Sequence, residues 1–313
     1  MKKTDLIYVP GHDGLVGKAL LGELNRAGYH NIICRRQREL DLRDQRLVAR
    51  FFKEQRPEYV FLLAARVGGI QANNMYPAEF IYDNLMIEAN IINSAYKWGV
   101  KKLLFLGSSC IYPKFALQPM KEDYLLTGVL EPTNDAYAIA KIAGIKLCQA
   151  YRKQYNFNCI CAMPTNMYGP HDYFNPDNSH VLPALIRRFH EARSAELSTI
   201  TVWGSGKPMR EFLFVDDCAR ALLFLMEHYE NPDIINVGTG QDVTIAEVAE
   251  MIKREVGFKG RIQFDASKPD GTPRKVLDVS RINALGWRAS VSLKEGIKKT
   301  YQWFCTHYDH IRK

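Results

Sequence analysis

Residues 4–28 read TDLIYVPGHDGLVGKALLGELNRAG, and this stretch decides the fold. The apolar run before Gly11 is typical of a buried strand, and apolar residues at helical spacing follow Gly17. Glycines at 11, 14 and 17 allow the backbone to turn tightly and to approach a pyrophosphate at the N-terminus of a helix. We therefore predict a dinucleotide-binding loop between a first strand and a first helix.

The stretches that follow continue this alternation of strand and helix. Further strands are expected at NIICRR (31–36), EYVFLLAA (58–65), 102–106 and CICAMP (159–164), with helices at 45–55, 79–98 and 137–151 and a loop at 66–78. This order predicts an α/β protein with a Rossmann-like, doubly wound parallel sheet. We expect residues 1–165 and about 211–240 to form the dinucleotide-binding domain. Residues of about 166–210 and 241–313 would form a smaller, discontinuous α/β substrate lobe.

Three arginines, Arg35, Arg36 and Arg38, stand at the end of the second expected strand. In such folds an acidic residue at this place binds the ribose hydroxyls of NAD, whereas arginine accommodates the 2′-phosphate of NADP. Because no acidic residue stands there, the sequence favours NADP(H) as the cofactor. The other interpretation is a solvated basic turn.

Polar residues in the stretch 106–141 predict the chemistry. Ser108 directly follows an apolar strand, and Tyr137 and Lys141 have the spacing Tyr-x-x-x-Lys, which places both on one face of a helix. An ammonium group near a phenol favours the phenolate, so we expect Lys141 to lower the pKa of Tyr137. A serine hydroxyl would hold a substrate carbonyl beside that phenol. This arrangement suits proton transfer at an oxygen while a hydride moves at its carbon.

The overall composition excludes several classes of protein. The net charge of +8 comes without a long Lys/Arg run, so we expect a phosphorylated or nucleotide-linked small molecule rather than nucleic acid. No apolar run approaches the roughly 20 residues that cross a membrane, and the first residues are typical of a strand rather than a signal peptide. The 7 cysteines form no Cys-x-x-Cys pair, which favours reduced thiols, a cytoplasmic location and no metal site.

Longer stretches make the chain similar to known enzymes over essentially its whole length. These stretches are GSSCIYPK (107–114), NDAYAIAK (134–141), PTNMYGPHDYFNPDNSHVLPALIRRFHEA (164–192), VWGSGKPMREFLFVDD (202–217) and KPDGTPRKVLDVSR (268–281). With them the chain resembles the extended short-chain dehydrogenase/reductase family, and in detail its epimerase–reductases of GDP-keto-deoxy sugars. The resemblance implies NADPH-dependent 3,5-epimerisation and 4-reduction of GDP-4-keto-6-deoxy-D-mannose. It also implies a homodimer built on the helices at 79–98 and 137–153.

The resemblance assigns roles to single residues. Ser108, Tyr137 and Lys141 match the reductase triad, Cys110 matches the base that removes protons beside the ketone, and His180 matches the acid on the opposite face. Four residues match positions that hold the GDP-sugar: Arg188, Trp203, Arg210 and Asp270. The implied cofactor contacts are Gly11, Gly14, Leu15, Val16, Gly17, Arg35, Arg36, Arg38, Ala64, Ala65, Leu106, Gly107, Ser108, Lys141, Pro164, Asn166, Met167 and His180.

The chain departs from this family at two positions. Members often carry arginine where Asp13 and Gln37 stand here, and an acid at position 13 would repel the 2′-phosphate unless a neighbouring arginine compensates. Two alternatives to the implied activity remain open. One is the conversion of another GDP-keto-deoxy sugar, such as a heptose or a colitose precursor. The other is a non-catalytic protein that binds a cofactor or RNA on the same fold.

Overall fold

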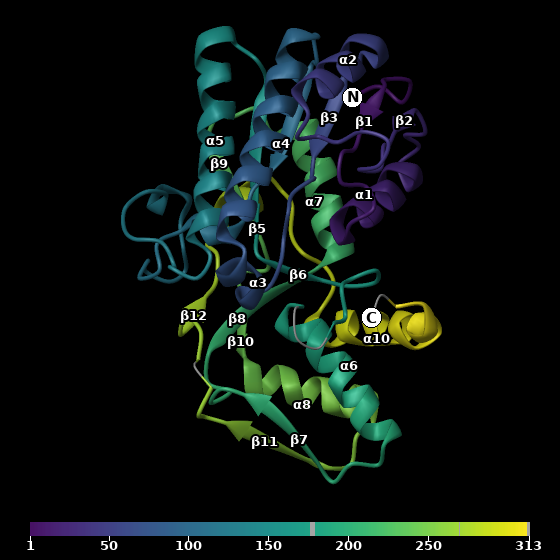
Figure 1. Ribbon diagram of the computed structural model, residues 1–313, viewed down its shortest axis with the longest axis vertical. Coiled ribbons are helices and arrows are strands. Elements are labelled where there is room, and N and C mark those ends of the chain that lie inside the picture. The colour runs from purple at the N-terminus through teal and green to yellow at the C-terminus, as the bar shows by residue number, and fades with distance from the viewer. Residues whose placement is uncertain (176–178, 269, 312–313) are drawn as a thin grey trace.

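The computed structural model describes residues 1–175, 179–268 and 270–311, which form an upper and a lower lobe in Figure 1. The upper lobe is built on a six-stranded sheet in the order β2-β1-β3-β4-β5-β9, and every pair in it is parallel. Its strands are β1 (Ile7–Tyr8), β2 (Ile32–Ile33), β3 (Tyr59–Leu62), β4 (Lys102–Leu106), β5 (Cys159–Pro164) and β9 (Ile234–Val237). The predicted doubly wound parallel sheet is therefore confirmed.

Helices cover both faces of this sheet (Figure 1). On one face α1 (Leu15–Arg26) packs against α7 (Val215–His228). On the other, α4 (Pro77–Lys97) packs against both α2 (Gln45–Gln55) and α5 (Asp135–Tyr155). Because water reaches neither face, β4 and β5 are buried at every residue, as is usual for central parallel strands. Cys159 and Cys161 on β5 are accordingly core residues with free thiols.

The stretch 66–78, which was expected to be a loop, instead contains a helix and the start of another. Helix α3 spans Ile70–Met75, and α4 begins at Pro77. The Asn73 amide donates to the carbonyl oxygens of Gly68 and Gly69, which closes the turn before α3. Proline is favoured in the first turn of a helix because its missing N–H would have no partner there, which explains why α4 starts at residue 77.

The lower lobe has its own hydrophobic core, separate from that of the sheet. It contains α6 (Val181–Ser194), α8 (Ile245–Val256) and α10 (Leu293–His307), together with the parallel pair β7 (Thr199–Trp203) and β11 (Arg261–Asp265). Strand β8 (Met209–Phe214) pairs with β6 (Asn166–Tyr168), β10 (Asp242–Thr244) and β12 (Arg274–Lys275). The short helices are η1 (Ser109–Ile111), η2 (Glu122–Tyr124), α9 (Ser280–Ala284) and η3 (Tyr308–His310).

Strand β8 joins the two cores. It lies outside the six-stranded sheet, although residues 211–240 were expected to continue the first domain. Leu213 packs into the core of the upper lobe, whereas Phe212 and Phe214 pack into the core of the lower lobe. Successive side chains of a strand point to opposite faces, so β8 can pack side chains into both cores. The domain division drawn from the sequence stays a prediction.

Among the described residues, none of the helices combines the length and the apolar character that crossing a bilayer requires.

Candidate active site

The carboxyl ends of β1, β3, β4 and β5 meet at one edge of the sheet, where most of the residues expected to bind the cofactor lie. The strand order places β2 and β3 on opposite sides of β1, and ligands of such sheets bind at this switch point. Gly11 follows β1 with φ +93°, and a Cβ there would lie 2.6 Å from the Ala64 nitrogen at the end of β3. A Cβ on Gly17 would lie 2.1 Å from the Gly11 oxygen. This turn therefore admits only glycine at both positions.

The glycine loop leads into an open helix N-terminus. Gly14 is the N-cap of α1 and has no side chain to accept from the N–H groups that follow. The first amides of a helix lack partners within the helix, so those of Leu15 and Val16 are available to an anion. This geometry fits the pyrophosphate of a dinucleotide.

The basic residues after β2 are partly neutralised by the acid in the glycine loop. Arg36 Nε lies 3.4 Å from Asp13 Oδ2, and His12 Nε2 lies 3.3 Å from Asp13 Oδ1. Within the described ranges Arg35 and Arg38 make no ion pair, so their charges remain available to a 2′-phosphate. Of the other expected cofactor residues, Ala65, Leu106, Gly107, Pro164, Asn166 and Met167 line the same carboxyl edge, at or just beyond the ends of β3, β4 and β5.

Ser108 and Tyr137 meet where β4 ends and α5 begins. A hydrogen bond to Ser108 lowers the pKa of the Tyr137 phenol, but burial outweighs it and, with the charges of Cys110 and Glu88, raises that pKa far above its ordinary value. The ring also packs edge-on against Phe80 at 6.5 Å between centroids. Tyr137 therefore stays a protonated phenol, which is the form that donates a proton to a carbonyl oxygen.

Lys141 does not lower the pKa of Tyr137 as the spacing predicts, so that expectation is wrong. Its Nζ lies 5.9 Å from the centre of the Tyr137 ring and 3.1 Å from Glu88 Oε1 on α4, and it donates to the Leu106 oxygen at 3.1 Å. Lys141 and Glu88 are both only 2% exposed. The Glu88 carboxylate thus offsets the charge of the Lys141 ammonium, which we expected from the sequence to stabilise the Tyr137 phenolate.

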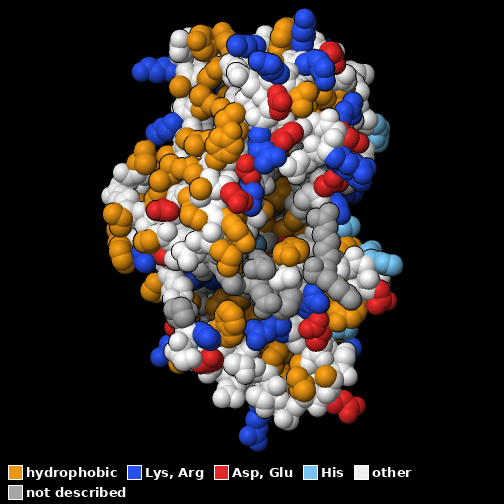
Figure 2. Space-filling view, viewed as in Figure 1, with side chains coloured by type: hydrophobic (Ala, Val, Ile, Leu, Met, Phe, Trp, Pro, Cys, Tyr) orange, Lys and Arg blue, Asp and Glu red, His pale blue; other side chains and the backbone are white. Residues whose placement is uncertain are grey.

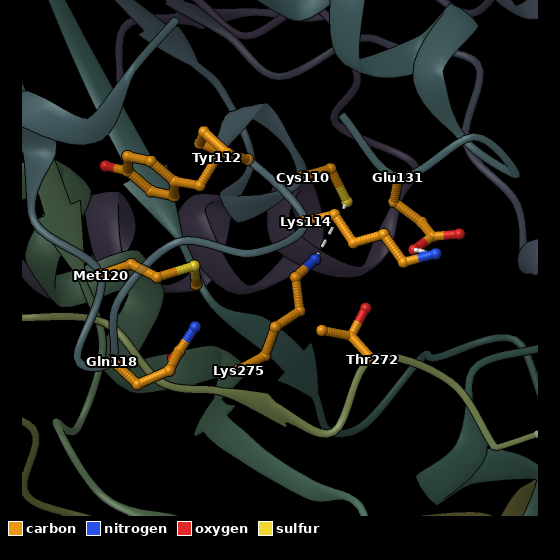
Figure 3. A pocket seen from close by; sticks show the side chains of 9 residues that line it. Cys110, Tyr112, Lys114, Gln118, Met120, Glu131, Thr272 and Lys275 are labelled. Carbon is orange, nitrogen blue, oxygen red and sulfur yellow. Dashed lines mark hydrogen bonds and ion pairs between the residues drawn. The ribbon is translucent and has the colours of Figure 1, made fainter. Parts of the chain in front are cut away.

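Cys110 lies in a small pocket between the two lobes, lined by the loop 110–131 and by the segment 272–275 (Figure 3). Its backbone N–H donates to Ser108 Oγ at 3.3 Å, which links Cys110 to the residue beside Tyr137. Its sulfur accepts from Asn134 Nδ2 at 3.4 Å and faces Lys275 Nζ at 3.9 Å. The thiol therefore has one amide donor and one cation beside it.

His180 occupies a different position in the molecule. His180 is the exposed N-cap residue of α6. Desolvation of its imidazole by the surrounding protein lowers the pKa of the ring. In the described part of the chain no hydrogen bond joins this ring to Cys110 or Tyr137. Figure 2 shows that this face of the molecule is hollowed between the two lobes.

The four residues expected to hold the GDP-sugar lie in the lower lobe, around the turn after β7. Asp270 accepts from the Ser205 N–H at 2.8 Å and from Ser205 Oγ at 2.6 Å, beside Trp203, which is 57% exposed. Arg210 donates to the Thr272 oxygen at 2.6 Å, and burial lowers its pKa while Asp270 opposes that shift. Arg188 on α6 donates to the Thr201 oxygen of β7 at 2.7 Å.

Three residues of the site carry no role in the sequence analysis: Glu88, Asn134 and Lys275. Glu88 lies on the buried face of α4, which also carries Asp83, Asn84 and Asn90, so the helix pattern does not single it out. Asn134 and Lys275 lie inside stretches that carry the family resemblance. Their contact with Cys110 depends on the tertiary fold and could not be found from spacing.

Comparisons with known proteins identify the family of the chain. The model of the NAD dependent epimerase/dehydratase family matches residues 7–238. The GDP-L-fucose synthase of Escherichia coli K12 is 56% identical over 315 residues, which cover 98% of each chain. The structure of a GDP-L-fucose synthetase from Naegleria fowleri bound to NADP has a TM-score of 0.92 at 32% identity, covering 100% of this chain and 98% of that one.

A third similar protein acts on a different sugar. The structure of a GDP-6-OMe-4-keto-L-xylo-heptose reductase from Campylobacter jejuni has a TM-score of 0.93 at 38% identity, covering 98% of this chain and 99% of that one. The family model spans most of the chain, and these relatives match it almost from end to end. The chain therefore belongs to the NAD dependent epimerase/dehydratase family.

Proposed function

We propose that this protein is a GDP-L-fucose synthase, which converts GDP-4-keto-6-deoxy-D-mannose to GDP-L-fucose by 3,5-epimerisation and 4-reduction. One observation carries the proposal: the half-buried Tyr137 lies beside Ser108, whose hydroxyl accepts from the Cys110 N–H, at the carboxyl edge of the sheet, and the pKa of its phenol is raised. The identity of 56% to the Escherichia coli enzyme over the whole chain supports the choice of sugar.

The epimerisation requires proton exchange next to a ketone. In our proposal the Cys110 sulfur removes the proton from carbon 3 or carbon 5, and the C–H electron pair moves into the carbonyl to form an enolate. Ser108 and Tyr137 donate hydrogen bonds to the enolate oxygen, which stabilises the charge as it develops. His180 returns a proton to the opposite face of the carbon, so the configuration is inverted.

The reduction uses the same carbonyl oxygen. Bound NADPH supplies the hydride that reduces carbon 4. Tyr137 gives its proton to the oxygen, and the raised pKa of the phenol keeps that proton in place until the oxygen becomes basic. Lys141, fixed by Glu88 and by the Leu106 oxygen, stands behind Tyr137 as the cationic member of the triad.

The remaining residues would bind the two nucleotides. The glycine loop and the open N-terminus of α1 would hold the cofactor pyrophosphate, with Arg35 and Arg38 toward the 2′-phosphate. Arg188 and Arg210 would neutralise the diphosphate of the GDP-sugar, since arginine forms strong hydrogen bonds to phosphate oxygens. Trp203 offers a half-exposed ring, and Asp270 offers a carboxylate for the nucleoside.

We further propose a homodimer formed through α4 and α5, in the cytoplasm. Large apolar side chains on these two helices remain exposed, with 61% of Tyr82 and 46% of Ile139 accessible. Exposed apolar side chains on two helices that pack together favour association. Light scattering at micromolar concentration should give about twice the 35.9 kDa of one chain. The mass of a single chain would contradict this interface.

The test of the activity is deuterium incorporation. The purified protein is incubated with GDP-4-keto-6-deoxymannose and NADPH in heavy water, and the product is read by mass spectrometry and NMR. We expect deuterium at carbons 3 and 5, consumption of NADPH and an L-galacto product. Cys110→Ser and His180→Gln should then affect different proton steps.

Other outcomes of this experiment would change the assignment. Reduction without solvent deuterium would indicate a plain 4-keto reductase, and the roles of Cys110 and His180 would be wrong. Absence of turnover with intact binding of NADPH would favour another GDP-keto sugar, such as a heptose. Absence of cofactor binding as well would favour a non-catalytic protein.

A further inference from the structure

Asn134 is the N-cap residue of α5, yet its side chain does not cap the helix. Asparagine favours this position because its side-chain oxygen normally accepts from the N–H groups of the first turn. Here the side chain turns to Cys110 instead, and Nδ2 donates to the sulfur at 3.4 Å. The Oδ1 atom is buried and has no hydrogen-bond partner among the described residues. A missing cap and a buried unpaired acceptor both cost stability, so neither explains why the side chain adopts this orientation.

The backbone of Asn134 is fixed on both sides. Its N–H donates to the Glu131 oxygen at 3.1 Å, and the Glu131 carboxylate pairs with Lys114 at 3.0 Å (Figure 3). Its own oxygen accepts from the Ala138 N–H at 3.0 Å, as part of α5. The amide that contacts Cys110 is therefore carried by an anchored turn and not by a flexible surface segment.

The Cys110 side chain has more freedom than its backbone. The Cys110 N–H is held by Ser108 Oγ at 3.3 Å, but the sulfur turns about one bond with three staggered positions. Within the described ranges the polar contacts of the sulfur are Asn134 Nδ2 at 3.4 Å and, farther away, Lys275 Nζ at 3.9 Å. The contact with Asn134 thus favours one rotamer over the other two.

We propose that Asn134 is a positioning residue that holds the Cys110 sulfur in the rotamer facing the sugar carbon to be deprotonated. This inference rests on the proposed function, in which the sulfur takes that proton and the C–H electron pair passes into the carbonyl. Asn134 neither gains nor loses a proton in this step. Asn134 and Tyr137 are three residues apart at the start of α5, so one helix end sets both the sulfur and the phenol.

The predicted effect falls on proton exchange more than on reduction. A displacement of about 1 Å between reacting groups can slow a reaction about 100-fold, and a change of rotamer moves the sulfur farther than that. Loss of the amide should therefore slow deuterium exchange at carbons 3 and 5 by about 10- to 100-fold. Reduction should suffer less, because Tyr137 keeps its own hydrogen bond to Ser108. A larger share of the reduced product should then lack inversion at carbons 3 and 5.

The test compares Asn134→Ser with Asp135→Ser in heavy water containing GDP-4-keto-6-deoxymannose and NADPH. Serine is a good N-cap but is too short to replace the amide, so Asn134→Ser should keep or raise the Tm. The ratio of deuterium exchange to NADPH consumption should fall about 10- to 100-fold, while KM for the sugar changes less than about twofold. Asp135→Ser introduces the same residue at the exposed neighbouring position of the same turn and should leave the ratio unchanged.

Three results would overturn the proposal. The first is an unchanged ratio in Asn134→Ser. The second is a raised KM with unchanged exchange at saturating sugar, which would mean that Asn134 contacts the substrate rather than Cys110. The third is an equal loss of exchange and reduction together with a lowered Tm, which would mean that Asn134 only supports the fold.

A second measurement contains no sugar. Crystal structures of the original chain and of Asn134→Ser should show one Cys110 rotamer in the former, and a different rotamer or several in the latter. A single, unmoved sulfur in Asn134→Ser would overturn the proposal. If the original chain exchanges no deuterium, the proposed function fails, but this structural comparison still decides whether Asn134 positions the sulfur.

Discussion

Replacement of Glu88 by methionine tests whether the Lys141 site depends on a buried ion pair. Glu88 on α4 and Lys141 on α5 lie 3.1 Å apart, and each is 2% exposed. Neither Glu88 oxygen has a partner with hydrogen-bonding geometry among the described residues, so charge carries the attraction. Burial raises the pKa of Glu88, and Lys141 opposes that shift. Removal of the carboxylate leaves the ammonium buried between the Leu106 oxygen and the Phe105 ring, with no opposite charge paired to it among the described residues.

The magnitude follows from the burial of both groups. Removal of one member of a buried pair costs about 3–5 kcal/mol, whereas replacement of both by apolar residues is often neutral or stabilising. An unfolding entropy of about 2.1 cal/mol/K per residue gives about 0.66 kcal/mol/K for 313 residues. We therefore expect Glu88→Met to lower the Tm by about 5–8 °C.

The assay is a double-mutant cycle followed by thermal unfolding. Glu88→Met and Lys141→Met should each lower the Tm, and Glu88→Met/Lys141→Met should recover most of the loss, because no charge then remains unpaired. A Tm within about 1 °C of the original for Glu88→Met would refute the reasoning. A double variant whose loss equals the sum of the single losses would refute it as well, since independent sites are additive.

Three further predictions concern other parts of the chain. Asp13→Asn removes a half-exposed negative charge beside Arg36. If this charge costs about 1 kcal/mol of NADPH binding, kcat/KM for NADPH should rise about fivefold and that for NADH should change little. Equal effects on both cofactors would contradict this. Burial raises the pKa of Asp172 to about 7, so its carboxyl contributes stability at low pH that is lost as the pH rises through 7. Denaturant unfolding of Asp172→Asn should match the original chain near pH 4 and exceed it by up to about 4 kcal/mol above pH 7; a constant difference across this range would exclude the titration. Gly17→Ala, whose Cβ would lie 2.1 Å from the Gly11 oxygen, should weaken NADPH binding at least about tenfold by fluorescence titration, whereas Gly22→Ala has open space and should bind normally.

Features set by neighbours in sequence could be predicted. The glycine loop is defined by spacing alone, and the helix at 45–55 appears with the same bounds as α2 because Asp44 caps it by accepting from the N–H groups of Arg46 and Leu47. The pKa of Tyr137 could not be predicted, because adjacency to Lys141 suggests a lowered value whereas burial and Glu88 raise it. Glu88 is far from Lys141 in sequence, and only the packing of α4 on α5 brings them together.

The residues proposed for reduction and those proposed for epimerisation also differ in whether one lobe or both assemble them. Ser108, Tyr137, Lys141 and Glu88 all belong to the upper lobe, so the reductase residues are assembled by the packing of α4, α5 and β4 alone. The environment of Cys110 is completed by Lys275, which arrives from the other end of the chain through the hydrogen bonds between the loop at 118–120 and the segment 276–278. A small movement at that contact changes the distance from the ammonium to the sulfur but leaves the Tyr137 site untouched. Because the surroundings of Cys110 need both lobes whereas those of Tyr137 need one, loosening the contact between the lobes should impair proton exchange before hydride transfer.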